Sequence, residues 1–383
     1  MTRNVNQSAI IGSLAGVAAL AALLAVNYGW RQAALFFVGT CAGIILYHAA
    51  FGFTAAWREV ALTGNGEGLR AQMLMLAVTV VVFSLLIAQG EVAGTPLRGS
   101  VAPLSMAIVF GAFLFGVGMQ LGGGCASGTL FTAGGGNMRM LVTLAAFIAG
   151  SLIGSWQWGF WQTVPSLAPF ALTERFGVGA GIGVSLLLFA GVWATSIAYQ
   201  RRRSVVTTRD FASNGYTFLR GPWPLIAGAL ALSAVNVSTL MLAGRPWGVT
   251  SAFTLWGAKI ATYVGLDVSG WEYWARSGSA ASLQQSVLAD VTSVMNFGIM
   301  LGALLAAGLA GKFAPSLRLP LRSLLAAVIG GLMLGYGARI AYGCNIGAYF
   351  GGISSTSLHG WLWFVAAFAG STLGTKLRPL FRL

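Results

Sequence analysis

Cys125 and Cys344 lie in two short glycine-rich segments that resemble each other. The first is in "LGGGCASG" (121–128) and the second in "YGCNIG" (342–347). A neutral thiol is a weak hydrogen-bond donor with a polarizable sulfur atom, so a line of thiols can pass a soft anion along without holding it tightly. Two thiols within disulfide reach can also undergo redox chemistry. Weak anion relay or a redox step is therefore the chemistry that these residues predict.

The glycines beside both cysteines permit irregular backbone and close approach of another group. At membrane depth such backbone is tolerated only where it is buried in protein or lines a cavity, which predicts re-entrant loops. Free N–H groups and helix N-termini there bind anions. Close helix packing by small residues is the alternative explanation for the glycines alone. The candidate pathway residues are Gly122, Gly123, Gly124, Cys125, Gly128, Arg339, Gly343, Cys344, Asn345 and Gly347, with Cys41 as an additional thiol.

Arg339 is the strongest candidate for a functional charge within a membrane helix, because it lies five residues before Cys344 in an otherwise apolar segment. Charges at membrane depth are costly, so this side chain is expected to face either the pathway or a backbone carbonyl group. Four other cations are expected to extend from helix ends to the membrane interface, namely Arg58, Arg139, Arg245 and Lys259. Residues that either line the path or form hydrogen bonds between helices are His48, Gln120 and Asn137.

The sequence gives no support for a metal, a cofactor or a catalytic set. Only His48 and His359 accompany three widely spaced cysteines, and none has CxxC or CxxH spacing. A glycine-rich nucleotide loop with Lys and Ser or Thr is absent, so direct pumping driven by ATP is not expected. We expect no enzyme activity and no disulfide framework.

The elements that must position these residues are membrane helices. Of 383 residues, 57% are hydrophobic and 8% charged, against about 25% charged in a soluble domain. Stretches near the roughly 20 residues that cross a bilayer recur along the chain. They predict an all-α polytopic membrane protein with about ten transmembrane helices. These are expected at 8–26, 31–51, 70–89, 101–121, 139–157, 177–199, 223–243, 291–311, 321–341 and 359–376.

The net charge of +14 follows a topological pattern rather than a nucleic-acid-binding one. Short segments rich in Lys and Arg stay on the cytoplasmic side. Three such segments are expected to be cytoplasmic. The first contains Arg201, Arg202, Arg203, Arg209 and Arg220, the second contains Lys312, Arg318 and Arg322, and the third contains Lys376, Arg378 and Arg382. Both termini, including Arg3, are then cytoplasmic in a bacterial inner membrane. The segment 262–290, with its Trp and Tyr residues, is expected to be a periplasmic interfacial loop.

An internal repeat links the two cysteine segments. "GMQLGGGCASGTLF" (118–131) aligns with "GARIAYGCNIGAYF" (337–350) at a shift of 344 − 125 = 219 positions, and "FIAGSLIG" (147–154) with "AFAGSTLG" (367–374) at a shift of 220. "FGFTAAW" (51–57) resembles "WGVTSAF" (247–253) at a shift of 196. The expected topology runs the two halves in opposite directions across the membrane. Inverted repeats of this kind place a substrate site near the midplane, between interrupted helices.

The repeat predicts a division of the chain. The expected parts are an additional N-terminal helix (1–30), a first repeat (31–176), a connecting helix with a basic cytoplasmic loop (177–222) and a second repeat (223–383).

At these motifs the sequence resembles the YeeE/YedE family of sulfur-transport membrane proteins. The resemblance rests on "GGGCASG" and "GARIAYGCNIG", with support from "HAAFGFTAAW" and "GRPWGVTSAFTLWGAK". It implies an hourglass-like fold and a relay of thiosulfate by Cys125 and Cys344, with Cys41 as the additional family cysteine. It also implies a cytoplasmic TusA-like sulfur carrier as partner. The additional N-terminal helix departs from shorter members.

The predicted function is uptake of thiosulfate by a monomer in the lipid bilayer, with no nucleic-acid partner. Three alternatives stay open. They are transport of another sulfur or selenium compound, a membrane sulfurtransferase that forms Cys persulfides, and a structural or partner-binding subunit without flux.

Overall fold

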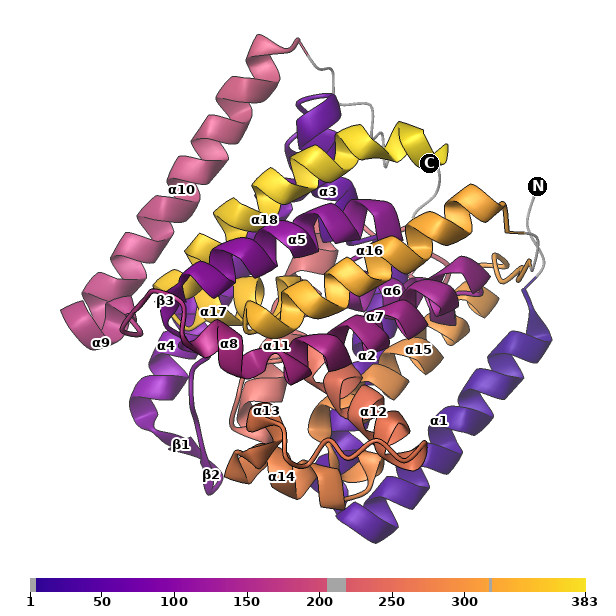
Figure 1. The fold of residues 1–383 in the computed structure, drawn as a ribbon. Helices are drawn as coiled ribbons and strands as arrows, with labels where there is room; N and C mark the ends of the chain where they lie inside the picture. Colours follow the sequence, from indigo (N-terminus) through magenta and orange to yellow (C-terminus); the bar gives the residue numbers. More distant parts are fainter. Residues whose placement is uncertain (1–4, 205–217, 317–318) are drawn as a thin grey trace.

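The computed structural model describes residues 5–204, 218–316 and 319–383, and helices form nearly all of its regular structure (Figure 1). Nine helical segments in this part of the chain are long and apolar enough to cross a membrane. The chain is therefore an all-α polytopic membrane protein. The nine segments are Gln7–Tyr28, Trp30–Leu62, Glu67–Gln89, Met106–Gly134, Met138–Trp156, Val178–Arg202, Leu225–Ala243, Val291–Leu309 and Leu321–Ile340.

Several helices are interrupted, and the interruptions fall at the sequence motifs. In the first half, α2 is followed after His48 by a break and the short α3, and α5 is followed by the Cys125 turn and the short α6. The second half shows the same order, with α12 after α11 and with the π-helical η2 and α17 after α16. The bounds are α2 (Trp30–His48), α3 (Phe53–Leu62), α5 (Met106–Gly122), α6 (Ala126–Gly134), α11 (Leu225–Ala243), α12 (Thr250–Tyr263), α16 (Leu321–Ile340), η2 (Asn345–Gly351) and α17 (Gly352–Ser354).

The other long helices connect or enclose these broken ones. They are α1 (Gln7–Tyr28), α4 (Glu67–Gln89), α7 (Met138–Trp156), α10 (Val178–Arg202), α15 (Val291–Leu309) and α18 (Leu358–Leu377). The short elements are α8 (Trp158–Gln162), α9 (Leu172–Phe176), α13 (Glu272–Ala275), α14 (Ser277–Gln284), η1 (Val287–Ala289) and η3 (Arg378–Phe381). Two small antiparallel ladders pair β1 (Glu91–Val92) with β2 (Thr95–Pro96) and β3 (Leu104–Ser105) with β4 (Ser166–Leu167).

Side-chain caps fix the start of two long helices. The Ser105 hydroxyl accepts a hydrogen bond from the Ile108 N–H group (3.3 Å) at the start of α5, and Asp290 accepts one from the Ser293 N–H group (2.8 Å) at the start of α15. Such caps satisfy N–H groups that have no partner inside the helix. The helix expected over 101–121 accordingly begins later, at Met106, because Pro103 disfavours helical backbone at the residue before it.

Glycine contacts between the helices correspond residue by residue in the two halves. A Cβ atom at Gly116 of α5 would overlap the carbonyl oxygen of Ala367 in α18, and one at Gly335 of α16 would overlap that of Phe147 in α7. Gly335 follows Gly116 by the 219-position shift, and Ala367 follows Phe147 by the 220-position shift. The pair α5 and α18 therefore packs as the pair α16 and α7 does.

The counterpart helices α5 and α16 also contact each other, in opposite directions. Gly111, near the start of α5, lies against Gly337, near the end of α16, whereas Gly118, near the end of α5, lies against Gly330. Backbone contact at both points is possible because glycine has no Cβ atom. The two helices that lead into the cysteine loops are thus antiparallel.

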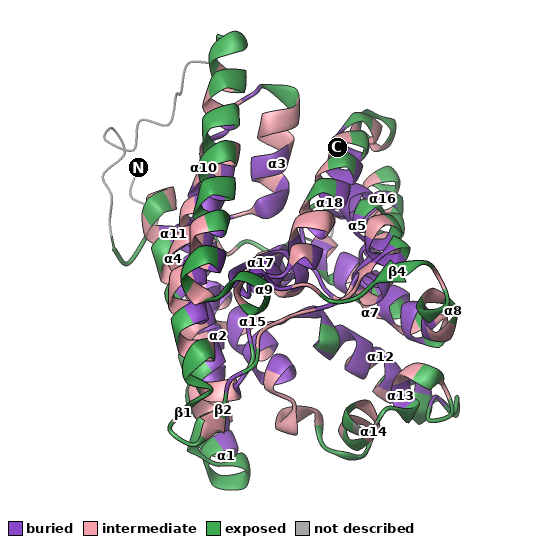
Figure 2. Cartoon of the chain, turned by 90° about the vertical axis from the view of Figure 1, so that its left-hand side faces the viewer, coloured by how far each residue is buried: buried purple, intermediate pink, exposed green. Residues whose placement is uncertain are grey.

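Helices α1 and α10 lie at the periphery. In each of them only 17% of the apolar stretch is buried, and Figure 2 shows α10 along one side with mostly exposed and intermediate residues. Helix α1 packs on α15 and α2, and α10 packs on α4 and α9. Their exposed apolar side chains suit a lipid environment.

Some sequence expectations change in detail. The helix expected at 359–376 forms as α18, although it is not one of the nine segments given above as long and apolar enough to cross a membrane. Helix α12 ends at Tyr263, near the start of the interfacial loop expected at 262–290. Within that loop the chain forms two further short helices, α13 and α14. The division of the chain into 1–30, 31–176, 177–222 and 223–383 stays a prediction. Arg3, Arg209 and Arg318, used to orient the chain, lie outside the described residues.

Candidate functional site

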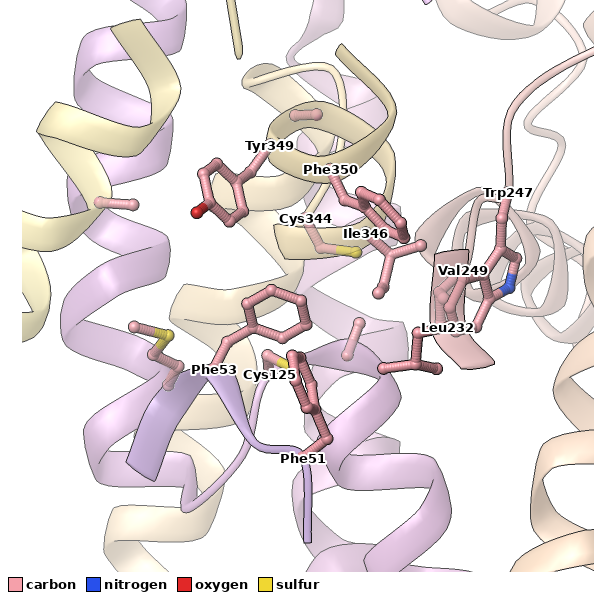
Figure 3. Close-up of a cluster of buried hydrophobic side chains, with 14 of the residues drawn as sticks. Phe51, Phe53, Cys125, Leu232, Trp247, Val249, Cys344, Ile346, Tyr349 and Phe350 are labelled. Carbon is pink, nitrogen blue, oxygen red and sulfur yellow. The ribbon is translucent and has the colours of Figure 1, made fainter. Parts of the chain in front are cut away.

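Cys125 and Cys344 lie in the same buried cluster. Their exposed fractions are 2% and 0%. Figure 3 shows Cys125 beside Phe51 and Phe53, with Cys344 above it beside Ile346. The two thiols thus face one small region from two loops that are far apart in the sequence.

The same cluster contains the two breaks that follow α2 and α11. Phe51 and Phe53 come from the first break, and Trp247 and Val249 come from the second. At the 196-position shift Phe51 corresponds to Trp247 and Phe53 to Val249. Two break segments and two cysteine loops therefore meet as corresponding pairs. The break motifs are visible in the sequence, but they do not predict that these four apolar residues pack with the thiols, because apolar side chains beside a break also suit ordinary core packing.

The first cysteine loop is a tight turn between α5 and α6. Gly123 ends α5 with a φ of 93°, a left-handed conformation that favours glycine. The Cys125 Sγ atom accepts a hydrogen bond from the Gly128 N–H group (3.4 Å) and so caps α6, and it lies 3.5 Å from the Ser127 hydroxyl. The Thr129 hydroxyl donates to the Cys125 carbonyl oxygen (2.9 Å). These bonds fix the thiol at the N-terminus of a short helix.

Arg139 secures the end of α5 that leads into this turn. Its guanidinium donates hydrogen bonds to the carbonyl oxygens of Leu121 (2.6 Å), Gly122 (2.8 Å) and Ser323 (3.1 Å). Leu121 and Gly122 end α5, where carbonyl groups have no partner within the helix, and Ser323 lies at the start of α16, so the cation also ties the two helices together. Arg139 therefore does not simply extend to the membrane interface, as we expected from its position near a helix end.

The second cysteine loop has a more irregular backbone. Tyr342 and Gly343 have positive φ values of 61° and 150°, and a π-helical turn follows Cys344. The Trp363 indole N–H group donates to the Gly343 carbonyl oxygen (3.2 Å) and holds the loop against α18. Backbone strain and π-helical turns of this kind are frequent at functional sites.

Asn345 is the polar residue of this loop. It is fully buried, and neither its Nδ2 nor its Oδ1 atom has a hydrogen-bond partner among the described residues. A buried amide without partners costs free energy, so it needs an explanation such as a ligand or bound water. The corresponding position in the first loop is Ala126 at the 219-position shift, so only one half carries this amide.

A cavity of about 280 Å³, here called the Arg339 vestibule, opens beside the second loop. Arg245 and Arg339 give it two cationic side chains, and Gly343 and Gly347, on either side of Cys344, are part of its wall. The lining residues are Gly99, Ser100, Arg245, Pro246, Trp247, Gly248, Val249, Thr250, Ser251, Arg339, Tyr342, Gly343 and Gly347. A concave, cationic cavity next to a thiol loop suits an anion.

Arg245 was expected at the membrane interface, yet it lines this vestibule and donates a hydrogen bond to the Thr292 hydroxyl (3.1 Å). Lys259 instead donates to the carbonyl oxygens of Leu283 (2.6 Å) and Gln285 (2.7 Å). At the 196-position shift Arg245 corresponds to Ala49, so the first break carries no cation at this position.

A much smaller hollow, the Phe51 recess, lies at the first break. It has a volume of about 20 Å³, room for about one water molecule, and residues 50–52 in its wall correspond to residues 246–248 of the Arg339 vestibule. It is lined by Ala50, Phe51, Gly52, Ala55, Ala56, Glu59, Gly68, Gln72 and Leu225. The two hollows are therefore counterparts of unequal size and charge.

Cys41 is not one of the fully buried residues of the cluster that contains Cys125 and Cys344. It is half-buried on α2 and packs against the large core that includes both other cysteines. Among the residues described, no group of three or more His, Cys, Asp or Glu side chains is placed to hold a metal ion.

Comparisons with known proteins agree with these features. A model of the family described as sulphur transport matches residues 48–373. The thiosulfate transporter TsuA of Spirochaeta thermophila is 28% identical over 342 residues, which are 85% of this chain and 92% of that protein. TsuA of Escherichia coli is 23% identical over 349 residues, which are 87% of this chain and 90% of that protein.

The chain also matches part of the probable transporter YedE of Escherichia coli, with 34% identity over 166 residues. These residues are 42% of this chain and only 40% of the length of YedE. The family model, in contrast, covers both break motifs, both cysteine loops and the residues that line the Arg339 vestibule. The chain belongs to the sulphur transport family of membrane proteins.

Proposed function

We propose that the chain imports thiosulfate, a sulfur-containing anion, through the cluster where the two cysteine loops meet. The observation that carries the proposal is the position of Cys125 and Cys344, on corresponding loops in one buried cluster beside a cationic vestibule. The two TsuA relatives, matched over nine-tenths of their length, support the choice of substrate. We infer a transport function rather than an enzymatic one.

The anion enters the Arg339 vestibule, where Arg245 and Arg339 attract it. It then passes Gly343 and Gly347 and reaches the thiol of Cys344, where the partnerless amide of Asn345 offers a hydrogen bond. Cys125 receives it at the N-terminus of α6, with Gly122, Gly123, Gly124 and Gly128 shaping the loop backbone. Weak thiol donors suit such a step because they release what they bind.

The charge pattern orients this path. We place the Arg339 vestibule on the periplasmic side and the Phe51 recess on the cytoplasmic side of a bacterial inner membrane, with both termini in the cytoplasm and the two halves inverted. The small volume of the recess favours entry from the vestibule. A TusA-like sulfur carrier that consumes thiosulfate in the cytoplasm would favour net uptake.

Uptake of a dianion works against the membrane potential. An inside-negative potential of about 100 mV opposes entry of two negative charges by roughly 4–5 kcal/mol. Rapid consumption inside, a steep gradient or a coupled cation offsets this barrier.

Uptake by purified protein in liposomes tests the proposal. We expect uptake of intact, doubly labelled thiosulfate down its concentration gradient, and less uptake of sulfate, sulfite or selenite. Uptake of selenite alone would show that selenite, and not thiosulfate, is the substrate. Persulfide on Cys125 or Cys344, detected by mass spectrometry together with release of sulfite outside the vesicles, would instead indicate a sulfurtransferase. Vesicles no more permeable than protein-free ones would contradict transport.

A further inference from the structure

Arg339 is held in the vestibule by aromatic residues of two short loop helices. Its Nη1 atom donates a hydrogen bond to the hydroxyl of Tyr273 in α13 (2.7 Å). The guanidinium carbon lies 4.5 Å from the centre of the Tyr273 ring and 5.3 Å from that of Trp158 in α8, and these two rings meet edge to face. A cation over two aromatic faces is attracted by both and its plane is fixed.

One edge of the guanidinium carries no bond. The Nε atom is buried without a partner, and no hydrogen bond from Nη2 exists within residues 5–204, 218–316 and 319–383. A buried N–H group of a cation without an acceptor is destabilising. Nε and Nη2 are also the pair of donors that binds two oxygen atoms of one oxyanion in a fork.

The counterpart residue in the first half is neutral, and both hydrogens of its amide group are bonded within the protein. At the 219-position shift Arg339 corresponds to Gln120. The Gln120 Nε2 group donates to the Thr54 carbonyl oxygen (3.0 Å) and the Ser371 hydroxyl (2.8 Å). The Gln120 Oε1 atom has no partner among the described residues, so the first half leaves an acceptor unpaired, whereas the second half leaves the donors of a cation unpaired.

Helix α7 makes room for that cation. A Cβ atom at Gly154 would lie 2.8 Å from the Arg339 Cβ atom, so glycine allows the arginine stem to pass close to α7. At the 220-position shift Gly154 corresponds to Gly374, which stands in the same relation to Gln120, at 3.0 Å. Glycine thus leaves room for the side chain at the paired position in both halves.

We propose that the Nε and Nη2 edge of Arg339 is a subsite for a tetrahedral oxyanion and that Tyr273 is the residue that positions it. The inference rests on the proposed import of a sulfur anion and specifies how its first site selects. Two sulfonate oxygen atoms occupy the fork, and the terminal sulfur of thiosulfate is left to lead toward Gly343, the neighbour of Cys344. Sulfate and methanesulfonate fit the same fork, and hydrosulfide, which has no oxygen, does not.

Equilibrium binding of labelled thiosulfate to purified protein in detergent tests the subsite without requiring transport. In the wild type, unlabelled sulfate and methanesulfonate should displace thiosulfate, and hydrosulfide should not. Tyr273→Phe keeps the aromatic face and removes the hydroxyl, so we expect a Kd about three- to tenfold higher with an unchanged number of sites. Arg339→Lys keeps the charge but loses the paired N–H donors. The concentration of methanesulfonate needed to displace thiosulfate should therefore rise by at least about three- to tenfold. The control is Tyr263→Phe at the end of α12, where Tyr263 is 91% exposed.

The outcomes separate the two claims. If Tyr273→Phe and Arg339→Lys bind thiosulfate with the wild-type Kd, the subsite is overturned. It is also overturned if only the number of binding sites falls, because a merely structural role changes the amount of folded protein and not the affinity. Displacement by hydrosulfide as strong as by sulfate would also overturn it. If binding behaves as expected but liposomes take up no thiosulfate, the subsite stands and the proposed import fails.

Discussion

Gly116 and Gly335, at corresponding positions in the two halves, make the same contact: each lies directly against a carbonyl oxygen of a neighbouring helix. The contacted residues, Ala367 and Phe147, also correspond. The two broken helices that carry the cysteine loops are therefore fixed in place by backbone-to-backbone packing. Such packing is sensitive to a single added methyl group, because the facing atoms belong to backbone that cannot rotate away.

We expect Gly116→Ala and Gly335→Ala each to lower the free energy of unfolding by about 1–3 kcal/mol through overpacking. The measurement is thermal unfolding in one detergent, followed by intrinsic fluorescence. Gly183→Ala is the matched control, because no atom lies within 4 Å of a Cβ built at Gly183 of α10. Equal melting temperatures of Gly116→Ala, Gly335→Ala and Gly183→Ala would contradict the close packing.

Arg139→Gln should destabilise the end of α5. The substitution removes hydrogen bonds from a cation to the carbonyl oxygens of Leu121, Gly122 and Ser323. A bond to a charged group contributes about 1.5–3 kcal/mol, so we expect a loss of at least that size in unfolding free energy. The measurement is a thermal melt beside Arg201→Gln, at the exposed end of α10. A melting temperature like that of Arg201→Gln would show that the clamp contributes nothing.

Asn345→Ala should separate stability from transport. The Asn345 amide has no protein partner in the part of the chain described, so its removal should leave the unfolding free energy unchanged or raise it. Thiosulfate uptake should fall by about fivefold or more, the effect of one lost hydrogen bond to the anion. Asn236→Ala is the contrast, because Asn236 Oδ1 accepts a hydrogen bond from the backbone N–H group of Trp247 (2.8 Å). Loss of this bond should lower the free energy of unfolding by about 1–3 kcal/mol. Normal uptake by Asn345→Ala would remove this residue from the path.

Much of this arrangement could be predicted from the sequence, because its signals are local or repeated. Apolar stretches of about 20 residues indicate membrane helices whatever their neighbours are. The glycine-rich segments around Cys125 and Cys344 mark breaks, and their alignment at one shift indicates that both loops have a similar role. These signals depend on chain composition and spacing, not on which helices contact each other.

The rest depends on long-range contacts that spacing does not encode. Tyr273 lies 66 residues before Arg339, in a loop where we expected only interfacial anchoring, and nothing local marks it as the partner of a buried cation. Arg139 was expected to extend to the interface, since the carbonyl groups that it binds end a different helix. The apolar residues of the two breaks, such as Phe51 and Trp247, join the thiols only after folding.

The central claim, that both thiols lie on the path of the anion, is tested most directly by thiosulfate uptake into liposomes containing Cys125→Ala or Cys344→Ala. Ser185→Ala is the control, since this buried hydroxyl of peripheral α10 bonds only to the Gly181 carbonyl oxygen among the groups described. With equal amounts of folded protein, we predict that each cysteine variant takes up thiosulfate no faster than protein-free liposomes, and that Ser185→Ala matches the wild type. Uptake at the wild-type rate by either cysteine variant would contradict the claim.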